Sequence, residues 1–156
     1  MLEEALAITV ELRRVLESEV ERSRTERETL RSLDSDRIFA GVAARAAFNA
    51  EVAELEGRLS GSLARAAGRI GAPEATLARL AERVPAETSA LSRVLADVKA
   101  LAGALAELDR LNLMLAGRAL ACVQSYLTAL HPPLAAYDRR GVRATVGSRG
   151  TTWSKV

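Results

Sequence analysis

Apolar residues recur at helical spacing along most of the chain. Between positions 2 and 33 they recur at intervals that place them on one stripe of a long amphipathic helix. Within it, residues 21–29 (ERSRTERET) carry no large apolar side chain. We expect this part of the helix to be solvated on all sides or unpaired at the end of a bundle. The stripe consists of Leu2, Leu6, Leu12, Leu16, Val20, Leu30 and Leu33.

A turn and a second long helix follow. The segment Leu33-Asp34-Ser35-Asp36 offers side-chain oxygens that can cap a new helix. From Ile38 to Ile70 apolar residues alternate by three and four, as in a coiled-coil seam, and only Arg45 interrupts them. Gly71-Ala72-Pro73 then ends this helix, because glycine suits a left-handed cap and proline cannot continue a helix.

The second half predicts one short helix and one very long one. The short helix is expected from Glu74 to Arg83, before a break at Val84-Pro85. Residues 86–130 contain no proline and carry two interleaved seven-residue repeats. Asn112, the one strongly polar residue of this seam, either fixes the register of the helices or belongs to a binding surface. The repeats are Leu91, Val98, Leu105, Asn112, Ala119 and Tyr126, and Val94, Leu101, Leu108, Leu115, Cys122 and Ala129.

The pattern changes after position 130. His131-Pro132-Pro133 stops the helix, and the rest is rich in Gly, Ser, Thr and Arg. We therefore expect a helical coiled-coil bundle over residues 1–131 and a flexible basic tail over 132–156, suited to act as an interaction arm. The predicted fold is all-α: an elongated antiparallel bundle of three to four helices.

The composition agrees with this fold and argues against some classes of function. Of the 156 residues, 49% are hydrophobic but only 3% are aromatic, a balance that favours helices over sheets. The net charge of +2 is too small for a sequence-independent nucleic-acid binder. The first residues are acidic, unlike a signal peptide, and no apolar run approaches the roughly 20 residues that span a bilayer. A cytoplasmic protein without stable membrane insertion is expected.

Few residues could carry chemistry. The single cysteine, Cys122, excludes an internal disulfide and lies on the apolar seam, where core packing is the expected role of its thiol. The single histidine, His131, suits a helix end, and one histidine cannot build a di-metal bundle site. The glycines form no phosphate-binding loop. We expect no enzyme activity, no cofactor and no metal.

One stretch carries a family resemblance. Residues 105–118 (LAELDRLNLMLAGR), the apolar helix after them, a proline-containing break, Tyr137-Asp-Arg-Arg-Gly141 and Arg149-Gly150 resemble the FlgN family of flagellar export chaperones. The family often has a Gly-Pro-Asp-Gly-like sequence after the tyrosine, whereas this chain has Asp138-Arg139-Arg140-Gly141. The specific part of the resemblance covers about Leu105 to Gly150.

The resemblance implies a chaperone that binds the C-terminal helical segments of the hook-filament junction proteins FlgK and FlgL. It also implies that Tyr137 docks the loaded chaperone on the export gate protein FlhA. Two other readings remain open: a self-associating coiled coil, such as a homodimer, and a membrane-surface binder. The residues expected to contact the client are Asn112, Leu115, Ala119, Cys122, Val123, Tyr126, Leu127 and Leu130.

Overall fold

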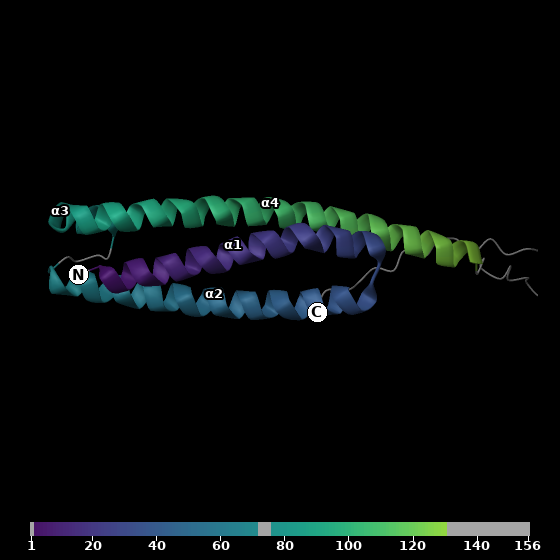
Figure 1. Cartoon of the computed structure of the whole chain (residues 1–156), viewed down its shortest axis with the longest axis horizontal. Coiled ribbons are helices and arrows are strands. Elements are labelled where there is room, and N and C mark those ends of the chain that lie inside the picture. Colours follow the sequence, from purple (N-terminus) through teal and green to yellow (C-terminus); the bar gives the residue numbers. More distant parts are fainter. Residues whose placement is uncertain (1, 72–75, 131–156) are drawn as a thin grey trace, which may run out of the picture. The chain divides into compact units, whose positions relative to one another are not determined.

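All the regular structure in the described part of the chain is helical. The computed structural model describes residues 2–71 and 76–130, and four α-helices run through them (Figure 1). These are α1 (Glu3–Ser32), α2 (Ser35–Arg69), α3 (Leu77–Arg83) and α4 (Pro85–Leu130). The prediction of an all-α helical bundle is confirmed. His131, Tyr137 and the predicted tail lie outside the described residues.

Local capping explains where the helices begin and end. Leu33 takes a left-handed conformation with φ of 54° and ends α1. The Asp34 carboxylate then accepts a 3.1 Å hydrogen bond from the Arg37 backbone N–H and caps α2. The predicted turn is therefore confirmed. The short helix begins later than expected, because the Thr76 hydroxyl caps α3 at Leu77.

The chain forms two compact units, the first ending at Ala119 and the second beginning at Leu120. In the first unit, α1 and α4 run in the same direction and α2 runs opposite to both (Figure 1). Polar contacts between the helices agree with these relative directions. They join Glu4 to Arg65 and Glu19 to Arg45 between α1 and α2, and Arg13 to Asp97 and Ser23 to Asn112 between α1 and α4.

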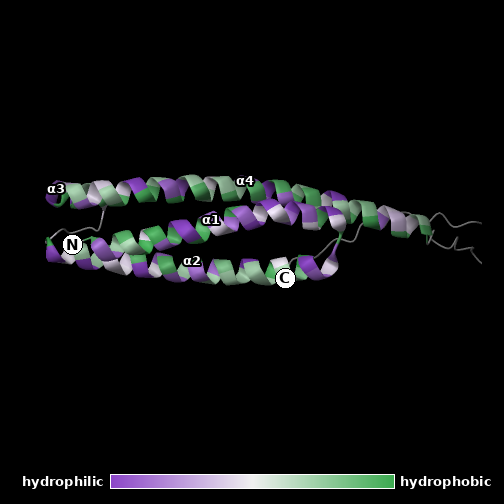
Figure 2. Ribbon diagram, in the orientation of Figure 1, coloured by the Kyte–Doolittle hydropathy of each residue, from purple (hydrophilic) through white to green (hydrophobic). Residues whose placement is uncertain are grey.

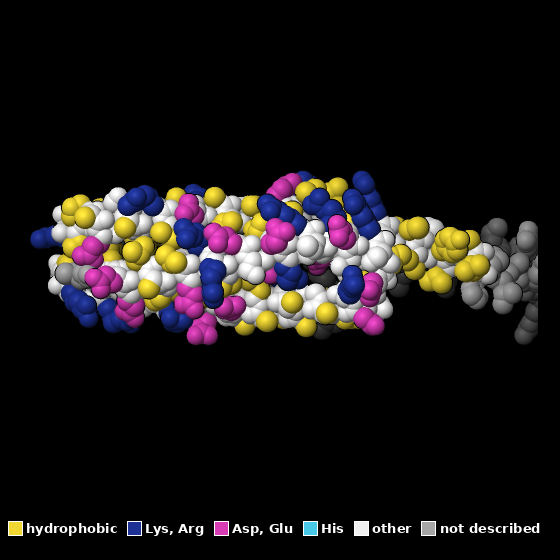
Figure 3. Space-filling view, in the orientation of Figure 1, with side chains coloured by type: hydrophobic (Ala, Val, Ile, Leu, Met, Phe, Trp, Pro, Cys, Tyr) yellow, Lys and Arg dark blue, Asp and Glu magenta, His cyan; other side chains and the backbone are white. Residues whose placement is uncertain are grey.

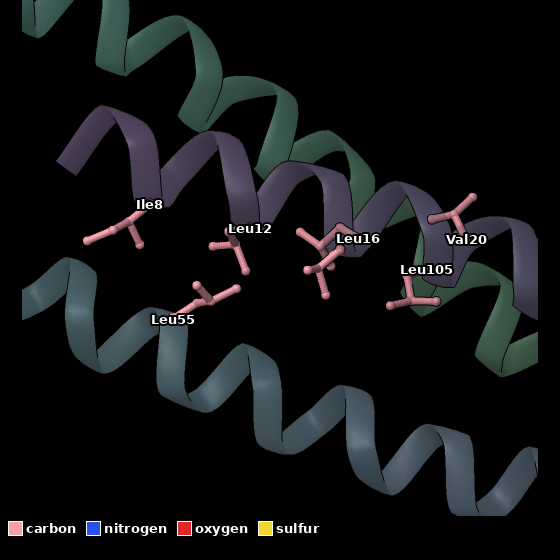
Figure 4. Packing of buried hydrophobic residues seen from close by; sticks show 7 residues of the cluster. Ile8, Leu12, Leu16, Val20, Leu55 and Leu105 are labelled. Carbon is pink, nitrogen blue, oxygen red and sulfur yellow. The ribbon is translucent and has the colours of Figure 1, made fainter. Parts of the chain in front are cut away.

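The core of the first unit consists of two aliphatic clusters. One lies mainly on α1 and receives one buried leucine from each of α2 and α4 (Figure 4). The other surrounds the first residues of α1 and includes the fully buried Leu80 of α3 and Leu91 of α4. The short helix α3 therefore packs into the core. The first cluster contains Ile8, Leu12, Val15, Leu16, Val20, Leu55 and Leu105, and the second contains Leu2, Ala5, Ala66, Leu80 and Leu91.

The charged stretch 21–29 is not simply solvated. Ser23 is fully buried, and its carbonyl oxygen accepts a 2.9 Å hydrogen bond from the Asn112 side-chain amide. The Glu26 carboxylate accepts a second bond from the same amide at 3.0 Å. The expectation of a solvated or unpaired segment is wrong here, because polar side chains on α2 and α4 supply partners that an apolar pattern does not reveal.

Candidate functional site

The described part of the second unit is the last portion of α4, and it is amphipathic. Leu120, Val123, Tyr126, Leu127 and Leu130 recur every three or four residues, so they share one side of the helix. Their exposed fractions range from 39% at Val123 to 71% at Tyr126. Figure 2 shows the hydropathy of this portion of α4, and Figure 3 shows hydrophobic side chains over it. We call these five residues the α4 apolar face.

The opposite side of the same turns is small and polar. Ala121, Gln124, Ser125, Thr128 and Ala129 lie there together. The Ser125 hydroxyl donates to the Ala121 carbonyl and the Thr128 hydroxyl to the Gln124 carbonyl, each at 2.9 Å. These hydroxyls are therefore satisfied by their own helix. The segregation of the two sides indicates that one side is suited to contact another apolar surface.

Leu120 was absent from the set of client-contacting residues expected from the sequence, although it is 59% exposed. That set combined five residues of the seven-residue repeats with Val123, Leu127 and Leu130, and Leu120 precedes Val123 by three residues and Leu127 by seven. The three-and-four spacing within residues 120–130 would have identified it.

Cys122 is exposed, so the expectation that its thiol packs in a core is wrong. Tyr126 and Ala129 of the same repeats are also exposed. A seven-residue repeat predicts a stripe, but the stripe is buried only where another helix lies against it. In the first unit this condition holds for Leu91, Leu105 and Asn112, which are all buried.

The remaining expected client contacts lie in the first unit. Asn112 is 5% exposed, and both N–H groups of its amide are used by Ser23 and Glu26. Leu115 and Ala119 are half-buried. Asn112 thus ties α4 to α1, which suits the register role considered for it.

A second polar arrangement joins all three long helices of the first unit. The Arg45 guanidinium of α2 lies 2.7 Å from the Glu19 carboxylate of α1 and also pairs with Asp109 of α4. Arg22 binds the same Glu19 carboxylate through its Nε at 2.7 Å, and this hydrogen bond raises the pKa of Arg22 above its usual value. The side chain of Glu19 is only 5% exposed. The arginine that interrupts the α2 seam is therefore the partner of a buried acid.

The helix α4 is the one described helix that is long and apolar enough to cross a membrane, by length and composition alone. Its most apolar window has a mean hydropathy of 1.3, and none of that window is buried. The expectation that no run approaches this length therefore has to be corrected for α4. The separation of Gln124, Ser125 and Thr128 onto one side suits a one-sided contact better than a bilayer on all sides.

The described side chains were also compared with the requirements of a metal site. Within residues 2–71 and 76–130, no group of three or more His, Cys, Asp or Glu side chains could hold a metal ion. The class of protein that these features define is an all-α bundle whose last helix exposes an apolar face.

The comparisons with known proteins identify the family. Residues 1–145 match the FlgN protein family. The chain belongs to the FlgN family, which places it among the flagellar export chaperones, a family of binding proteins. No curated protein and no solved structure matches it significantly.

Proposed function

We propose that this protein binds the C-terminal helical segments of the hook-filament junction proteins FlgK and FlgL in the cytoplasm and delivers them to the export gate protein FlhA. FlgN-family membership supports the general role of the chain as an export chaperone. The observation that carries the choice of site is the α4 apolar face, which is exposed while the opposite side of the helix is polar.

Leaving this apolar face in water costs free energy. Burying a large apolar side chain stabilises an assembly by roughly 1.5–3 kcal/mol relative to leaving it in water. An amphipathic helix can bury such residues against the apolar stripe of a partner helix. The FlgN resemblance implies that the C-terminal segments of the client are helical. The apolar stripes of those helices would supply the matching surface. Covering those stripes would also keep the client monomeric before export.

One of the residues expected to contact the client would support this contact without making it. Asn112 uses its amide within the bundle, so we assign it the register of α4 rather than client contact. We still propose that the client contacts Leu115, Ala119 and Cys122. Leu115 and Ala119 come before the α4 apolar face along the helix, and Cys122 lies between two of its residues. Tyr137 is proposed to dock the loaded chaperone on FlhA.

A pair of adjacent residues provides the test. Leu127→Glu places a charge on the α4 apolar face, and Thr128→Glu places the same charge on the polar side of the same turn. We expect Leu127→Glu to weaken the binding of the FlgK or FlgL C-terminal segment by at least about tenfold, and Thr128→Glu to leave it nearly unchanged. Isothermal titration calorimetry on the purified proteins measures both. Equal affinities for the two variants would contradict the assignment of the face.

The oligomeric state separates the chaperone from a self-associating coiled coil. A second copy of this chain could cover the same apolar face, as a homodimer. Light scattering on the free protein and on a mixture with the client segment distinguishes the two. A one-to-one complex supports the chaperone, whereas a mass that rises with concentration and ignores the client supports self-association.

A further inference from the structure

The end of the α1–α2 hairpin contributes no residue to the core. The buried residues of α1 run from Ala5 to Ser23, and those of α2 run from Leu55 to Ala67. Every residue between positions 24 and 44 is described, and none of them is buried. We call residues 24–44, which include the turn between α1 and α2, the hairpin end.

The apolar side chains of the hairpin end add little burial. Leu33, Phe39 and Val42 are each more than half exposed. Leu30 and Ile38 are half-buried, and neither belongs to the two aliphatic clusters of the core. Apolar burial is the dominant favourable contribution to folding. The hairpin end is therefore held in place much less strongly than the rest of α1 and α2.

Two hydrogen bonds from side chains tie the hairpin end to the rest of the described chain. The Glu26 carboxylate accepts one from the Asn112 amide of α4 at 3.0 Å, and the Gly41 carbonyl oxygen accepts one from the Arg22 guanidinium at 3.4 Å. The bond to Asn112 is the one of the two that reaches α4. When such a bond opens, water replaces the lost partner, so its net contribution to stability is small.

A polar layer separates the hairpin end from the aliphatic core. Arg45 of α2 pairs there with Glu19 of α1 and with Asp109 of α4. The aliphatic contacts end at the same level, where the first core cluster includes Val20 of α1 and has Phe48 of α2 packed against it. Local opening that begins at the hairpin end can therefore stop at this layer and leave the core intact.

We propose that the hairpin end detaches from α4 while the core of the first unit stays folded, and that the Asn112 amide is the contact that holds it in place. Segments with few buried apolar contacts open at a much lower free energy than the whole protein. The elements that move when a partner binds are drawn from such segments.

The role of this detachment rests on the proposed function. Asn112 lies on the same side of α4 as Ala119 and Tyr126, because the three share one position of the seven-residue repeat. Detachment uncovers the turn of α4 around Asn112 and so extends the α4 apolar face towards the start of the helix. A client helix that covers this longer side of α4 keeps the hairpin end detached.

Hydrogen exchange of the free, full-length protein, followed by mass spectrometry, tests the detachment. We expect the amides of residues 27–32 and 39–44 to exchange at least about a hundredfold faster than those of residues 8–20. Equal protection of the two regions would overturn the proposal.

Variants at Asn112 separate detachment from simple fraying of the helix ends, which would not respond to a change on α4. Asn112→Asp removes the amide donor and places a carboxylate against Glu26, so exchange of the hairpin end should become at least about tenfold faster. Leu113→Asp is the control, because it places the same charge on the next residue of α4, whose side chain is 75% exposed. Equal exchange rates in the two variants would contradict the role of Asn112.

Asn112→Leu provides the opposite change. It completes the apolar seam of α4 and removes the buried Oδ1, which has no hydrogen-bond partner in the described structure. Exchange of the hairpin end should become at least about tenfold slower than in the wild type. If Asn112→Asp does not fold, Asn112→Leu decides the question alone, and an unchanged or faster rate would overturn the proposal.

The same exchange experiment with a saturating C-terminal segment of FlgK or FlgL tests the role in binding. We expect exchange to become slower along residues 116–130 and faster in the hairpin end. If residues 116–130 are protected while the hairpin end behaves as in the free protein, the client-driven detachment is wrong and the proposed function stands. If neither segment changes the exchange of residues 116–130, the proposed function fails, and the client-driven step fails with it.

Discussion

The Arg45 guanidinium of α2 lies 2.7 Å from the Glu19 carboxylate of α1 inside the first unit. Glu19 is 4% exposed, and its carboxylate pairs with two arginines, Arg45 and Arg22. Removing one partner of a buried charge is costly, because the charge that remains is poorly solvated. The interruption of an apolar seam by an arginine is explained by this acid on another helix.

We predict that Arg45→Ala lowers the free energy of unfolding by about 1–3 kcal/mol. Asp109 would also lose the pairing with Arg45. Arg58→Ala is the control, because Arg58 pairs with Glu11 at 3.6 Å with about half of each side chain exposed, and such pairs contribute about 0–1 kcal/mol. Urea unfolding followed by circular dichroism measures both changes. A larger loss for Arg58→Ala would contradict the prediction.

The leucine that anchors α4 beside α3 gives a second prediction. Leu91 is fully buried, so Leu91→Ala should destabilise the protein by about 2–5 kcal/mol through lost apolar burial and a cavity. Leu113→Ala removes the same atoms from a side chain that is 75% exposed, and we expect a change within about 0.5 kcal/mol. Thermal unfolding compares the two. Similar losses would mean that the second core cluster does not form in solution.

The first turn of α1 predicts a pH dependence of stability. Hydrogen bonds from Arg65 and then Ser62 lower the pKa of the Glu4 carboxyl below its ordinary value of 4.5. A lowered pKa stabilises the folded state above 4.5, and this contribution is lost as the pH falls through the pKa of the folded protein. Glu4→Gln should therefore flatten the dependence of the unfolding temperature on pH below 4.5.

Glu3→Gln is the control for that experiment. Glu3 lies in the same first turn of α1, so it also feels the helix dipole. The hydrogen bonds from Arg65 and Ser62 go to Glu4. Unfolding temperatures across acidic pH compare the two variants with the wild type. If Glu3→Gln flattened the profile as much as Glu4→Gln, the helix dipole and not the bonds from α2 would be the cause.

The proposed division of roles predicts the behaviour of Tyr137→Ala. This variant should bind the FlgK and FlgL segments like the wild type and should lose affinity for the cytoplasmic part of FlhA when loaded with client. Pull-down of the chaperone–client complex on immobilised FlhA measures the loss, and titration with the client alone provides the control. Loss of client binding by Tyr137→Ala would refute the separation of the two sites.

The sequence alone predicted the helices well, because helix formation depends on local spacing and capping. The seven-residue repeat defined α4, and Asp34 and Pro85 marked the starts of α2 and α4. The FlgN resemblance of residues 105–150 also came from the sequence, and the match over residues 1–145 confirmed the family.

The sequence could not decide which parts of a stripe are covered. Cys122 and Leu105 both occupy seam positions, yet Cys122 is exposed and Leu105 is 7% exposed. Ser23 lies in a charged stretch and is nevertheless fully buried. Periodicity predicts which residues share one side of a helix, whereas burial depends on a second helix that is distant in the sequence.

What the sequence by itself determined is therefore the set of helices, their amphipathic stripes and the family. Only the tertiary structure decided that Arg45 pairs with Glu19, that Asn112 binds α1, and that the apolar face at the end of α4 stays exposed. The physical reason is that pairing and packing are properties of contacts between helices. Those contacts form between residues up to 89 positions apart, a separation that no local pattern encodes.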